Sequence, residues 1–209
     1  MRRSTRVITA FAAICLTAFP VFAQRERQKI EIVPPRDYKA PAIENSPELQ
    51  TNLTASMADV LNAYPQHGFK ADDIAATLID LRDPNNLRWA NVGGDRQIYP
   101  ASVVKMFYMA ALERQLQDGK VTMTPEMERG LHDMIVDSSN EATQYILDVL
   151  TDTSSGAELP PKEFEKWQYH RNRVNRFYSA MGYQNINVNQ KFDITSREFN
   201  KPITLPAFL

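Results

Sequence analysis

A serine and a lysine three residues apart are the side chains of this sequence best placed to do chemistry. Ser102 and Lys105 lie in residues 99–105, Tyr-Pro-Ala-Ser-Val-Val-Lys, where a helix is predicted to start. Residues three apart on a helix share a face, with Cβ atoms roughly 5–6 Å apart. A lysine whose pKa falls well below about 10.4 can take the proton of the serine hydroxyl and make it a nucleophile.

The residues of this predicted helix indicate whether Lys105 is buried. Lys105 is the only charged residue between Arg96 and Glu113, and residues 102–118 are otherwise mostly apolar, which predicts a helix in the protein interior. The free N–H groups at its start can also stabilise an oxyanion. The alternative is that Ser102 only caps the helix and that Lys105 reaches solvent.

A second polar group lies between two predicted helices, one over 124–137 and one from Ser138 or Ser139 to about residue 150. It contains Ser138, Ser139 and Asn140. The spacing Ser138-x-x-Glu141 is also a capping box, which by itself explains both residues as a helix start.

The remaining pattern predicts an α+β fold. Ser46, Pro47 and an acid begin an amphipathic helix, and two strands over 74–81 and 87–92 form a hairpin. A two-stranded ribbon is marginal alone, so the sheet needs further strands. A long helix is predicted over 162–181, closed by Gly182. Its arginines are expected on a solvated face (Arg171, Arg173 and Arg176).

The N-terminus is typical of an exported protein. Arginines precede an apolar run from Val7 to Phe22, which predicts a signal peptide over 1–23, cleaved after Ala23, and a periplasmic or secreted location. Residues 24–45 are charged and carry prolines, so we expect a flexible leader, followed by one domain over 46–209. The charge is nearly balanced, with 24 Lys and Arg against 25 Asp and Glu, and indicates no nucleic-acid surface.

The hairpin, the Ser102 motif and Ser138-Ser139-Asn140 together resemble the penicillin-recognising serine hydrolases, particularly class A β-lactamases. The family's second motif is Ser-Asp-Asn, and its middle acid is a serine here. The resemblance covers residues 46–150 and implies a β-lactamase/transpeptidase-like fold with a helical lobe and an antiparallel sheet. It implies Ser102 as the acylated nucleophile and Lys105 as its general base. Ser138 would relay a proton to the leaving nitrogen, and Asn140 would bind Lys105 and substrate.

The departures from this family leave the function open. No Lys-Thr-Gly or Lys-Ser-Gly follows Asn140, so we expect a fragment that lacks late sheet strands, exposes an apolar sheet edge and is poorly soluble. The Glu-x-x-Leu-Asn signature for deacylation is also absent. The candidates are therefore an exported β-lactam or related amide hydrolase, a penicillin-binding, D-Ala-D-Ala peptidase or esterase relative without efficient deacylation, and an inactive or non-enzymatic helical module.

The predicted partners follow from these candidates. We expect a small-molecule or peptide amide substrate, a monomer, no nucleic acid and no stable membrane span after cleavage. We expect no cofactor and no metal, because the histidines are isolated in the sequence (His67, His132 and His170).

Overall fold

The computed structural model describes residues 31–96, 98–184 and 186–188. The predicted signal peptide, residues 24–30 of the leader and the tail from residue 189 lie outside the described residues. The described chain belongs to the α+β class, as predicted. It contains strands β1 (Ile43–Asn45), β2 (Ala76–Asp80) and β3 (Leu87–Val92) and helices α2 (Pro47–Ala63), α3 (Val104–Gln117), α4 (Pro125–Ile135), α5 (Asn140–Thr151), α6 (Pro161–Arg171) and α7 (Arg173–Ala180), with short 3-10 helices η1 (Pro65–His67), η2 (Ala71–Asp73) and η3 (Ala101–Val103).

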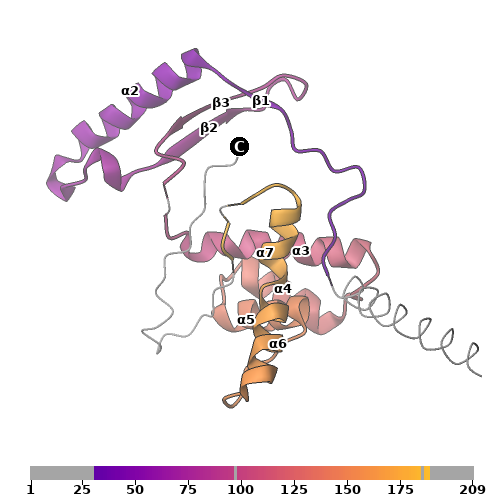
Figure 1. Ribbon diagram of the computed structural model, residues 1–209. Helices are drawn as coiled ribbons and strands as arrows, with labels where there is room; N and C mark the ends of the chain where they lie inside the picture. The colour runs from indigo at the N-terminus through magenta and orange to yellow at the C-terminus, as the bar shows by residue number, and fades with distance from the viewer. Residues whose placement is uncertain (1–30, 97, 185, 189–209) are drawn as a thin grey trace, which may run out of the picture.

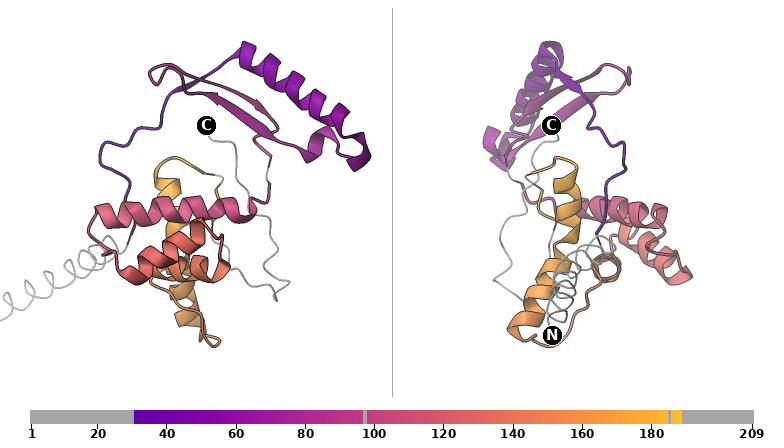
Figure 2. Two further views of the ribbon diagram at one scale, coloured as in Figure 1. Left: turned by 180° about the vertical axis from the view of Figure 1, so that it is seen from behind. Right: turned by 45° about the vertical axis from the view of Figure 1, so that its right-hand side comes forward.

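The elements form two groups (Figure 1). Helix α2 lies beside the sheet in one group, and α3 to α7 cluster in the other. Residues 31–42 and 93–100 join the two groups, and the views of Figure 2 show the same separation. Ser102 lies where the second connection enters α3.

The sheet has the order β1-β3-β2. The predicted hairpin is present: β2 runs antiparallel to β3 with Ile79 opposite Trp89. Its turn closes with a hydrogen bond of 3.1 Å from the Asn86 N–H to the Asp83 carbonyl. The third strand, β1, pairs parallel with β3 and comes from the segment before α2. The sheet is therefore mixed, which corrects the antiparallel sheet that the resemblance implied. Within the described residues β2 is an edge strand, and its Leu78 and Ile79 side chains are partly exposed.

Helix α2 begins as the sequence predicts. The Ser46 hydroxyl accepts a hydrogen bond of 3.3 Å from the Leu49 N–H, and Pro47 follows the cap. The helix buries no residue fully, and its inner stripe is half-buried (Leu49, Leu53, Met57 and Leu61). The Gln50 amide contacts both backbone groups of Asn91, at 3.1 and 3.2 Å, and so ties α2 to β3.

The leader differs from the flexible linker predicted over 24–45. Ile32 is buried in the helical core, and Glu31 forms an ion pair of 2.8 Å with Arg176 of α7. Tyr38 shares a hydrogen bond of 2.9 Å with Tyr183. Together with β1, these contacts anchor residues 31–45 to both groups of elements. This anchoring could not be predicted from the sequence, because one buried isoleucine and one ion pair form no periodic pattern.

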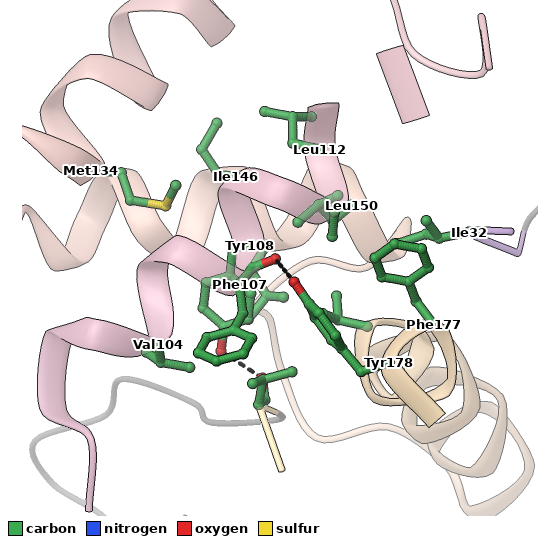
Figure 3. Packing of buried hydrophobic residues seen from close by; sticks show 14 of the residues in the cluster. Ile32, Val104, Phe107, Tyr108, Leu112, Met134, Ile146, Leu150, Phe177 and Tyr178 are labelled. Carbon is green, nitrogen blue, oxygen red and sulfur yellow. Dashed lines mark hydrogen bonds between the residues drawn. The ribbon is translucent and has the colours of Figure 1, made fainter. Parts of the chain in front are cut away.

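The hydrophobic core lies between α3, α4, α5 and α7 (Figure 3). Leu112 of α3 and Leu150 of α5 are completely buried. Two buried tyrosines bind backbone carbonyls: Tyr108 donates to Val188 at 2.6 Å and Tyr178 to Phe107 at 2.9 Å. Because burying one large apolar side chain contributes about 1.5–3 kcal/mol, this cluster holds α3 rigidly and with it the residues at its N-terminus.

The long helix predicted over 162–181 is two helices, α6 and α7, separated at Asn172. The prediction that its arginines are solvated is wrong for Arg171 and Arg173, which are each 3% exposed. The Arg171 Nη1 contacts the Asp148 carboxylate at 2.5 Å, and the Arg173 Nη1 donates to the Leu150 carbonyl at 2.9 Å. The break lets both cations turn towards the C-terminal part of α5, where carbonyls and the helix dipole favour positive charge.

Candidate active site

Ser102 lies in η3, immediately before α3. No side chain caps this short helix, so the interpretation of Ser102 as a helix cap is wrong. Its hydroxyl instead accepts a hydrogen bond of 2.9 Å from the hydroxyl of Ser138. Ser102 is exposed, as a nucleophile that must meet a substrate requires.

Lys105 lies in the first turn of α3 and points into the protein. It is 2% exposed, so the interpretation of Lys105 as a solvent-reaching cation is also wrong. Its Nζ donates to the Ser138 carbonyl at 2.5 Å, to the Ser138 hydroxyl at 3.0 Å and to the Asn140 side-chain oxygen at 3.1 Å. A buried ammonium needs such acceptors, because leaving it unpaired costs several kcal/mol (on the order of 3–5).

Ser138 lies in the connection between α4 and α5. Ser139 is the N-cap of α5, with its hydroxyl accepting from the Ala142 N–H at 3.1 Å, so the capping box from Ser138 to Glu141 does not form. Ser138 has a φ of 55°, in the left-handed region that non-glycine residues rarely adopt. Because Ser139 caps the helix, both the hydroxyl and the carbonyl of Ser138 can bind Lys105.

The four residues predicted from sequence therefore meet in one place. A chain of hydrogen bonds runs from Lys105 to the Ser138 hydroxyl and on to the Ser102 hydroxyl, with lengths of 3.0 and 2.9 Å. Asn140 closes the other side of the amine. Only Lys105 is buried, whereas the two serines and Asn140 are exposed. The Lys105 amine is thus shielded from water at one end of the chain of hydrogen bonds, and the Ser102 hydroxyl is open to solvent at the other.

Burial lowers the pKa of Lys105, and the nearby carboxylate of Glu141 acts in the opposite direction. A lower pKa makes the neutral amine more accessible, and a neutral amine accepts a proton. Hydroxyl hydrogens rotate freely, so the chain can also run in reverse, from Ser102 through Ser138 to the amine. The arrangement can therefore remove a proton from Ser102.

Two other features were not predicted. His132, Asp133 and Asp137 place ligand atoms within 4.8 Å of one another, although the sequence showed no metal-ligand spacing for the histidine. This exposed group could hold a cation, but no further contact points to one. A cavity of about 1250 Å³ lies between the 152–159 loop and α6, and none of the four site residues lines it.

No helix of the described residues has the length and apolar character needed to cross a membrane. No family model matches the chain, and neither a curated protein nor a solved structure matches it.

Proposed function

We propose that this chain is an exported serine hydrolase that opens a β-lactam or a related amide through an acyl-enzyme on Ser102. The observation that supports it best is the hydrogen-bonded chain from buried Lys105 through Ser138 to exposed Ser102. Activated serine nucleophiles need a base within hydrogen-bond reach, directly or through one relay.

Acylation begins with neutral Lys105. The Ser102 hydroxyl gives its proton to the Ser138 oxygen, and Ser138 passes its own proton to the Lys105 amine. The Ser102 oxygen then bonds to the substrate carbonyl carbon, and the N–H groups at the start of α3 stabilise the oxyanion. When the amide bond breaks, the proton returns through Ser138 to the leaving nitrogen. Asn140 holds the Lys105 amine in place throughout.

Labelling with a fluorescent penicillin tests the proposal. We expect the full chain to be labelled and the Ser102→Ala variant to remain unlabelled. Ser179→Ala, which removes an exposed hydroxyl on α7, is the matched control and should label normally. Labelling that survives loss of Ser102 would remove this residue from the role of nucleophile.

A penicillin-binding, peptidase or esterase relative with slow deacylation is the second candidate. The absence of a Glu-x-x-Leu-Asn signature from the sequence favours it. The rate at which the labelled protein loses its acyl group separates the two. Rapid turnover of a chromogenic cephalosporin supports the first candidate, and a stable adduct supports the second.

The non-enzymatic module requires the two serines to act only as helix caps. Neither Ser102 nor Ser138 makes a capping hydrogen bond, which counts against that alternative. The proposed export is tested separately, by fractionating cells that express the full chain and measuring the mass of the mature protein.

A further inference from the structure

The surroundings of the two hydroxyls carry information about the substrate. Exposed apolar side chains lie close in sequence to both serines. Two come within four residues after Ser102 and two within three residues before Ser138. We call these four side chains the apolar rim (Val103, Met106, Ile135 and Val136). Their exposed fractions are 51, 58, 39 and 66%. The hydrogen bond between Ser102 and Ser138 brings together the two chain segments that carry the rim.

The charges in the two segments that carry Ser102 and Ser138 are mostly negative. Lys105 is the only Lys or Arg between Arg96 and Arg114, and none lies between Arg129 and Lys162. The segment that carries Ser138 contains the exposed carboxylates Asp137 and Glu141. Glu141 is close enough to act on the charge of Lys105. In these two described segments, an anionic substrate group therefore meets carboxylates and apolar side chains, and the one cation is buried.

These contacts point to a class of substrate. We propose that Ser102 prefers neutral acyl donors with an apolar acyl group, such as short-chain esters, over anionic donors of the same length. This inference rests on the proposed function, because it needs Ser102 to be the nucleophile. Within that function it favours neutral amides and esters over penicillins, which carry a carboxylate and should acylate Ser102 more slowly. A carboxylate on the acyl group is repelled by the carboxylates of Asp137 and Glu141. Beside the apolar rim it also loses hydrating water molecules without gaining a hydrogen-bond donor in their place.

The reaction with such an ester balances without a cofactor. The Ser102 oxygen bonds to the acyl carbon, the bond from that carbon to the alcohol oxygen breaks, and the alcohol leaves. The proton of Ser102 passes to Lys105 through Ser138 and is available to the leaving oxygen. Water then cleaves the acyl-serine bond and releases the acid.

The sharpest test is a matched pair of chromogenic esters. p-Nitrophenyl butyrate and mono-p-nitrophenyl succinate have acyl chains of equal length and differ in a terminal methyl against a carboxylate. Each carboxylate about 8 Å away in water changes the rate roughly twofold. Loss of one apolar contact changes it about fourfold. After subtraction of the rate without protein, we therefore expect kcat/KM to be about 15-fold higher for the butyrate, with a smaller ratio at high salt.

Two variants assign the preference to its causes. Asp137→Asn should raise kcat/KM for the succinate about twofold and leave the butyrate unchanged, whereas Glu165→Gln on α6 should alter neither. Val136→Ser should lower kcat/KM for the butyrate but not for p-nitrophenyl acetate, whose acyl group is too short to reach the rim. Leu159→Ser, an exposed apolar residue in the loop before α6, is its control.

The acetate separates the two levels of the argument. If acetate hydrolysis survives Ser102→Ala, the proposed function fails and the substrate preference fails with it. If acetate hydrolysis depends on Ser102 but the succinate reacts as fast as the butyrate, only the substrate preference is overturned. A butyrate advantage that neither Asp137→Asn nor Val136→Ser changes also overturns it.

Discussion

Replacing Lys105 by methionine should separate the chemistry of the site from the stability of the fold. In the unfolded chain Lys105 titrates near 10.5, whereas burial lowers its pKa in the folded protein. Between these two pKa values the unfolded state binds more protons. The free energy of unfolding therefore rises with pH in this window, with a limiting slope of about 1.4 kcal/mol per pH unit. Methionine does not titrate, so Lys105→Met removes this contribution.

At neutral pH two opposing effects set the stability of the variant. The amine gives up its hydrogen bonds to Ser138 and Asn140, and a hydrogen bond to a charged group is worth about 1.5–3 kcal/mol. Removal of a buried charge offsets this loss, and water can reach the freed acceptors because both residues are exposed. We expect a net change within about 1 kcal/mol. Acylation of Ser102 should fall by about 10³, because the general base is gone.

Urea unfolding between pH 7 and 10.5, followed by fluorescence of Trp89 and Trp167, measures the effect. The informative quantity is the difference between the wild-type and variant curves. Burial raises the pKa of Tyr178, and burial with Tyr38 raises that of Tyr183 to about 12, which destabilises both proteins alike above about pH 10. Lys166→Met, the same substitution at an exposed position of α6, is the matched control.

A flat difference curve for Lys105→Met would refute the reasoning. It would mean that the folded protein does not depress the pKa of this amine. Lys105 could then not be a poised base, even if the variant lost activity.

Four further substitutions test the fold and the site. Ser138→Ala should slow acylation about 10²-fold with little loss of stability, whereas Ser139→Ala should cost about 1 kcal/mol of stability through the lost cap and leave acylation intact. Penicillin labelling and urea unfolding of both variants check this. Slower acylation in Ser139→Ala but not in Ser138→Ala would contradict the proposed roles of the two serines. Leu112→Ala should destabilise the protein by about 2–5 kcal/mol, measured by thermal unfolding. Ile32→Ala should speed proteolytic cleavage within residues 31–42, because the segment loses its buried anchor; an unchanged cleavage rate would refute that anchoring role.

Much of the site could be predicted from local sequence. A lone lysine in an apolar helix predicts a buried amine, and Lys105 is buried. The resemblance to the penicillin-recognising serine hydrolases implied Ser138 and Asn140 beside this lysine, and both bind its amine. The hairpin and the cap at Ser46 were likewise predictable, because turns and caps depend on residues a few positions apart.

Other features depend on contacts between segments far apart in the sequence. Either Ser138 or Ser139 can cap α5 by its local pattern, and the choice depends on where Lys105 arrives from α3. The strand β1 has three residues, too few for a clear alternation, and forms because β3 offers it an edge. The break at Asn172 accompanies two arginines that find acceptors on α5.

The sequence by itself therefore predicted the candidate residues Ser102, Lys105, Ser138 and Asn140 and most of the helices that carry them. The tertiary structure decided which serine faces the lysine, how the leader is anchored and which arginines are buried. The physical reason is that local propensity chooses among conformations of neighbouring residues. A buried charge instead selects its partners from whatever the fold brings within hydrogen-bond distance.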